Sequence, residues 1–86
     1  TDIEELLVQL RDQQQTLRQR HVNLEADAAR FVGKPIPPGI KDRLDTNAQD
    51  MRLLAENIAA KERDLIETQQ RFQEDLVRFR QLAGQN

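Results

Sequence analysis

Large apolar residues recur at every seventh position along both halves of the chain. We call these two series the heptad ladders. They consist of Ile3, Leu10, Leu17, Leu24 and Phe31 in the first half, and of Leu44, Met51, Ile58, Leu65, Phe72 and Phe79 in the second half. A seven-residue repeat keeps one face of a helix apolar and is typical of helices that coil around each other. Because one short loop separates the ladders, we predict an all-α fold, an antiparallel two-helix coiled-coil hairpin that forms a single domain over residues 1–86.

Capping signals define the ends of the first predicted helix. Thr1 followed by Glu4 fits a capping box, in which the Thr hydroxyl accepts a hydrogen bond from a backbone N–H and the Glu reaches back. Gly33 suits the left-handed conformation just past a helix end, and Pro35 prevents the helix from continuing. We therefore expect the first helix over residues 2–32.

A proline-rich loop over residues 33–38 connects the two predicted helices. Its prolines fix φ and restrict the residues before them, so we expect a stiff connection. Pro38 suits the first turn of the next helix. We predict a second helix over residues 38–83, because neither Pro nor Gly interrupts residues 40–83. The weak helix propensity of Asp45–Asn47 leaves open a kink at that point.

The ladders also need companion positions that complete the contact between the helices. With the ladders at heptad position d, the companions at position a follow each ladder residue by four. They are Leu7, Gln14, His21 and Ala28 in the first helix, and Ala48, Ala55, Glu62, Gln69, Leu76 and Ala83 in the second helix. Antiparallel helices form layers in which position a faces position d. The loop permits two registers: Leu24 faces Ala48 in the favoured register and Ala55 in the other.

The second predicted helix is longer than the first, so its far end lacks a partner within the chain. In the favoured register the first helix ends opposite about Gln70. An exposed apolar stripe of this kind marks an interface. Three partners are open: a second copy of the chain, sequence that precedes Thr1 and extends the first helix, or a different protein. Leu54 and Ile66 lie beside the ladder and widen the stripe. The predicted interface residues are Leu54, Ile66, Phe72, Leu76, Val77, Phe79 and Leu82.

This unpaired stripe leads to three functional hypotheses. The favoured one is a non-catalytic coiled-coil assembly module, in which two copies pair into a four-helix bundle and mediate homodimerisation of a larger protein. The second is a helical adaptor or chaperone that binds a foreign helix along the same stripe. The third is a signalling or spacer stalk. Its contact between the helices is polar around Gln14, His21, Glu62 and Gln69, and these polar layers permit a shift between the two registers. All three describe a protein–protein interaction and not an enzyme.

No pattern in the sequence indicates catalytic chemistry. His21 is the single histidine and cysteine is absent, so His21 lacks the companions that a metal site needs, and we predict a structural role for it. Carboxylates are abundant but fall on helix exteriors, apart from Glu62 on the predicted inner face. A two-helix hairpin offers no cleft in which acid–base catalysis could act. We therefore predict no catalytic residue, no cofactor and no metal.

Charge and composition narrow the set of partners. The net charge of −2 comes from 13 basic and 15 acidic residues that are interspersed, so no basic face suggests nucleic-acid binding. No apolar run approaches the roughly 20 residues that cross a bilayer, so we expect no direct membrane insertion. The lack of cysteine fits a reducing compartment and slightly favours a soluble, cytoplasmic protein. Because the chain opens on Thr1 and not on Met, we expect it to be a piece of a longer protein, which leaves localisation open.

Overall fold

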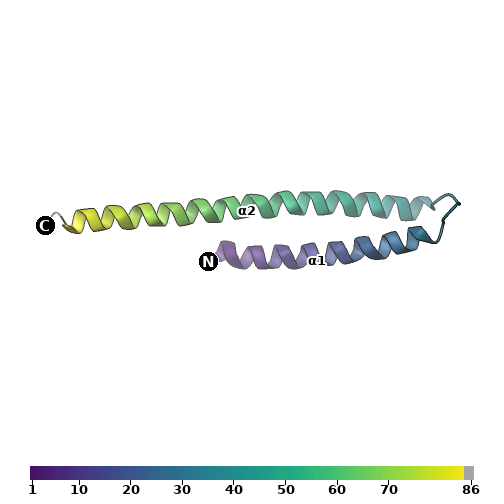
Figure 1. Cartoon of the computed structure of the whole chain (residues 1–86), viewed down its shortest axis with the longest axis horizontal. Coiled ribbons are helices and arrows are strands. Elements are labelled where there is room, and N and C mark those ends of the chain that lie inside the picture. Colours follow the sequence, from purple (N-terminus) through teal and green to yellow (C-terminus); the bar gives the residue numbers. More distant parts are fainter. Residues whose placement is uncertain (85–86) are drawn as a thin grey trace.

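The computed structural model describes residues 1–84 as a hairpin of two helices. Helix α1 spans Asp2–Ala29 and helix α2 spans Pro38–Gly84. The helices run antiparallel and lie side by side, and α2 continues well beyond the start of α1 (Figure 1). The hairpin is a rod with principal extents of 80 × 15 × 15 Å. The prediction of an all-helical hairpin is therefore confirmed.

The start of α1 follows the predicted capping pattern. The Thr1 hydroxyl accepts a hydrogen bond from the Glu4 backbone N–H at 3.2 Å, and the Glu4 carboxylate lies 3.6 Å from the Thr1 nitrogen. Asp2, Glu4 and Glu5 place negative charge in the first turn, where the helix dipole is positive. These local interactions stabilise the first turn of α1, which is followed by the core residues Leu7 and Leu10.

The end of α1 comes earlier than predicted, at Ala29 and not at Val32. The backbone N–H groups of Arg30 and Phe31 donate to carbonyls three residues back, at 3.3 and 3.1 Å, so the helix tightens as it ends. Gly33 then adopts a φ of +75°, which is the left-handed conformation expected of it. The connection between the helices is consequently longer than residues 33–38.

Helix α2 runs without a break from Pro38 to Gly84, so the kink considered at residues 45–47 does not occur. Pro38 occupies its first position, and the Pro37 carbonyl accepts hydrogen bonds from the N–H groups of Ile40 and Lys41. Asn47, the weak helix former in this stretch, is only 3% exposed. Its contacts with α1, described below, compensate for its low propensity.

The core is a narrow strip between the two helices. Leu7, Leu10 and Ile58 form its buried centre, and Ile3, Leu54 and Leu65 pack against them as partly buried residues. Leu24 is a further buried residue, nearer the loop. Ladder residues of both helices thus meet in the core, as a coiled coil requires.

The companion positions are correct for α1 and wrong for α2. Leu7 is buried on α1, and Gln14, His21 and Ala28 are partly buried there. On α2, by contrast, Ala48, Ala55 and Glu62 are exposed, whereas Asn47 is buried and Leu54 packs in the core. Where α2 lies beside α1, its companions therefore follow the ladder by three residues and not by four. In this part the α2 ladder occupies heptad position a, while the α1 ladder occupies position d.

For the same reason, neither of the two predicted registers is correct. A d ladder on one antiparallel helix faces an a ladder on the other, so large residues lie against large ones. Leu10 packs with Ile58, and His21 contacts Asn47, which fixes the alignment. The same alignment brings Leu24 level with Leu44 and not with Ala48. The early end of α1 shifts the middle of the loop toward Lys34 and accommodates this register.

A matched pair of glycine substitutions tests the loop geometry. Gly33→Ala should lower the free energy of unfolding by about 1 kcal/mol, because a side chain disfavours the left-handed conformation. Gly39→Ala lies in the first turn of α2 at ordinary φ, with no atom within 4 Å of the added Cβ, and should leave stability equal or raise it by about 0.5 kcal/mol. Urea denaturation followed by circular dichroism measures both. Equal effects of the two substitutions would contradict this account of the loop.

Candidate functional site

Helix α2 extends past the first turn of α1 and leaves a segment without a neighbouring helix. Ile3 and Leu65 pack against the same core cluster, so α1 begins at about the level of Leu65. We call residues 66–84 of α2 the overhang (Figure 1). It begins somewhat earlier than the predicted level of Gln70. Within the part of the chain that the structure describes, no α1 residue extends along it.

Large apolar side chains in the overhang are open to solvent. The exposed members are between 51% and 70% exposed, and they are Ile66, Phe72, Val77, Phe79 and Leu82. Leu76 is partly buried, although the overhang has no helix beside it. Six of the seven predicted interface residues thus lie in one stretch of helix that the hairpin does not cover.

Leu54 is the predicted interface residue that the structure removes from this set. It packs against the cluster of Leu7, Leu10 and Ile58 inside the hairpin. The error has the same origin as the wrong register, because Leu54 follows the ladder residue Met51 by three positions and so faces α1. Its side chain contributes to the hairpin core and is not part of a free surface.

The overhang carries its own apolar stripe, which we define as Phe72, Leu76, Phe79 and Ala83. The spacing of four, three and four residues places them on one face of α2. Here the companions follow the ladder by four residues, whereas inside the hairpin they follow it by three. At 3.6 residues per turn this turns the apolar face by about 50° around α2. The overhang stripe therefore faces a direction rotated from the side of α2 that contacts α1, and it does not continue that contact face in a straight line.

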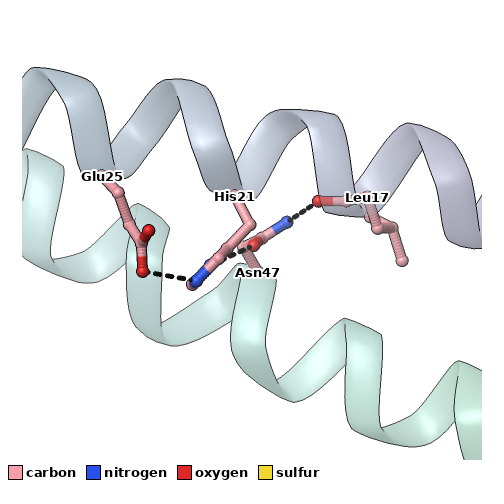
Figure 2. Close-up of polar contacts among 4 residues, drawn as sticks. All are labelled: Leu17, His21, Glu25 and Asn47. Atoms are coloured by element: carbon pink, nitrogen blue, oxygen red, sulfur yellow. Dashed lines mark hydrogen bonds and ion pairs between the residues drawn. The ribbon is translucent and has the colours of Figure 1, made fainter.

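A second feature is a polar layer inside the hairpin, in which the sequence predicted His21 but not its partner Asn47 (Figure 2). Asn47 is the buried polar residue at its centre, and its amide nitrogen donates to the Leu17 carbonyl at 3.2 Å. His21 Nδ1 lies 3.1 Å from the Asn47 amide oxygen, and His21 Nε2 lies 2.8 Å from the Glu25 carboxylate. We call these groups the polar layer.

The polar layer satisfies the groups that it buries. Both ring nitrogens of His21 face oxygen acceptors: a neutral imidazole donates to one of them, and an imidazolium donates to both. Among residues 1–84, no buried side-chain nitrogen or oxygen lacks a hydrogen-bond partner. His21 thus has a structural position in the hairpin, and its partner there is Asn47, which no sequence signal had singled out.

The polar layer ties the hairpin to one register. Sliding α1 by one heptad would move Asn47 away from His21 and opposite Gln14 or Ala28. A buried amide that loses its partners costs about 1–3 kcal/mol, and a single polar residue in a coiled-coil core is known to select register in this way. The layer therefore opposes the register shift on which the stalk hypothesis depends.

The remaining polar features are superficial. Arg11 and Glu62 form an ion pair at 3.1 Å between the helices, but their side chains are 57% and 47% exposed, so the pair contributes little to the stability of the hairpin.

An open groove near the loop has mixed charge and is lined by Arg20, Leu24, Asp42, Arg43, Thr46, Asn47 and Asp50. Residues 1–84 contain no group of three or more His, Asp or Glu placed to hold a metal ion. Neither α1 nor α2 contains an apolar stretch that could cross a membrane.

Comparisons with protein-family models, with curated proteins and with solved structures found no match to this chain. Function is therefore inferred from the geometry of the two helices alone.

Replacing the amide at the centre of the polar layer tests its contribution. Asn47→Ala should lower the free energy of unfolding by about 2 kcal/mol, because the hydrogen bonds to Leu17 and His21 are lost inside the core. Asn57→Ala is the matched control on the exposed side of α2 and should raise stability by up to about 0.5 kcal/mol through helix propensity. Chemical denaturation of both variants gives the difference. Similar values for the two would show that the layer contributes nothing.

Proposed function

We propose that the chain is a non-catalytic coiled-coil assembly module, which mediates homodimerisation of a larger protein through the overhang. One observation supports this proposal above all others: α2 projects beyond α1 and exposes Phe72, Phe79 and Leu82 to solvent. Two of the three phenylalanines of the chain lie in this segment. Contiguous exposed apolar residues of this kind favour an interface over a solvated surface.

Burial of the overhang supplies the driving force. Covering one large apolar side chain contributes about 1.5–3 kcal/mol. A two-fold dimer repeats every contact, so each residue of the overhang contributes twice. Association in turn costs several kcal/mol of translational and rotational freedom. The balance favours a dimer of modest affinity, which suits a module that acts as one part of a larger assembly.

The proposal is narrower than the four-helix bundle expected from the sequence. A full-length bundle needs further apolar residues on the outside of the hairpin, but Leu54, predicted to be one of them, packs inside it. The large apolar residues that are exposed in the paired part of the two helices are Leu6, Val8, Val22 and Leu53. They form no continuous stripe, because Gln15 separates Val8 from Val22 and Leu53 is the single one of them on α2. We therefore confine the proposed contact to the overhang.

A foreign helix is the second candidate partner, because it would bury the same side chains. The adaptor function requires the chain to be monomeric on its own, which separates it from self-assembly. The stalk function receives less support, since the polar layer holds one register.

Sedimentation velocity over a concentration series tests the proposal. The unaltered chain should shift from monomer to dimer by high micromolar concentration. Phe72→Glu combined with Phe79→Glu should stay monomeric while its circular dichroism remains helical, because two charges then occupy the contact. Leu53→Glu is the control, since Leu53 is 51% exposed on α2 but lies within the hairpin region and outside the overhang. It should dimerise normally.

A chain that remains monomeric at every concentration would reject self-assembly and favour the adaptor function. Equal loss of association in the Leu53→Glu control would place the contact outside the overhang and would also reject the proposal.

A further inference from the structure

We propose that the second copy lies antiparallel on the overhang in one defined register. This inference rests on the proposed homodimer and specifies its geometry. Phe72 of each copy lies against the partner's Ala83, and Leu76 lies against the partner's Phe79. The two-fold axis passes between the levels of Val77 and Arg78.

The overhang stripe is complementary to itself in this register. Antiparallel packing produces layers of facing residues, and here Phe72 meets Ala83, Leu76 meets Phe79, and the two-fold axis repeats both layers. All four layers are apolar, Phe72 faces the smallest residue of the stripe, and no layer places the two phenylalanines against each other. The register with more overlap by one heptad would place Phe72 against Leu76 and Phe79 against Gln69, which introduces a polar residue into the contact.

The sizes of the stripe residues favour the antiparallel direction. A parallel partner in register would place Phe72 against Phe72 and Ala83 against Ala83, so large residues would meet large ones and small residues would meet small ones. The charged residues do not decide the direction, because in the proposed register Asp75 is level with the partner's Arg80 but Arg78 is level with the partner's Val77.

The start of α1 limits how far the partner helix can extend. In the proposed register the partner's Gly84 lies level with Arg71, short of the first turn of α1. The register with more overlap would carry the partner's Gly84 to the level of Asp64, where α1 already packs beside α2, as the contact of Ile3 with the core cluster near Leu65 shows. All four apolar layers of the proposed register therefore lie on a part of α2 that α1, as described, does not cover.

This geometry separates the two loops of the dimer. Each α2 contains 47 residues, or about 70 Å of helix, and the overlap of residues 71–84 accounts for about 20 Å. The two loops then lie at opposite ends of the dimer, and the two α2 helices alone span about 120 Å. Small-angle X-ray scattering of the dimer should give a maximum dimension above this value, because a loop extends past each end, compared with 80 Å for one hairpin.

Disulfide crosslinking tests direction and register, and the absence of cysteine from the sequence provides a clean background. Leu76→Cys and Phe79→Cys are prepared as separate variants and oxidised mildly, alone and mixed. We expect disulfide-linked dimers mainly in the mixture, because residue 76 of one copy faces residue 79 of the other at the short range that a disulfide needs. Phe72→Cys mixed with Ala83→Cys should behave in the same way.

The outcomes separate this inference from the proposed function. Efficient crosslinking of Phe72→Cys alone would indicate parallel helices, because residues 72 of an antiparallel pair lie about 16 Å apart along the rod. Crosslinking of Phe72→Cys with Leu76→Cys would indicate the register with more overlap. Either result, in a protein that sediments as a dimer, would overturn the inference and leave homodimerisation intact. A monomer in sedimentation, with scattering that fits one hairpin, would overturn both.

Discussion

The packing of the α1 ladder against the α2 ladder is the interaction on which the rest of the structure depends. It buries Leu10 with Ile58 and supplies the tertiary packing from which most of the stability of a protein helix comes. Because α1 is shorter, the same packing decides where the shared core ends. Beyond the level of Leu65, α1 as described no longer covers α2. Because α1 is shorter than α2, the ladder residues that would complete the hairpin core are exposed in the overhang.

Sequence reasoning predicted the helices, the cap at Thr1 and the role of Gly33, because each depends on short-range patterns. It could not determine the companion positions of α2. A ladder of one large residue in seven permits companions three or four residues later, and hydropathy favoured Ala48 over Asn47. The structure buries Asn47 instead, since its amide finds both His21 and the Leu17 carbonyl across the contact. Only the paired helices reveal that these partners exist.

The same limit explains which parts of the candidate site were predictable. The overhang follows from unequal helix lengths, so its exposed residues were identified, even though the end of α1 was misplaced. Leu54 was misassigned because its role depends on the register, which is a property of both helices together. The polar layer was missed because His21 and Asn47 are far apart in sequence and each alone is an ordinary helical residue.

The two ends of α2 therefore have opposite properties along one continuous ladder. Near the loop, the polar layer gives the ladder a partner that only α1 supplies, and a second copy that displaced α1 would leave the Asn47 amide without His21. In the overhang, no buried polar group distinguishes one apolar partner from another, so selectivity there has to come from the match of large and small apolar residues. If two copies associate as proposed, the contact is confined to the overhang, because α1 already covers the rest of the α2 ladder in each copy.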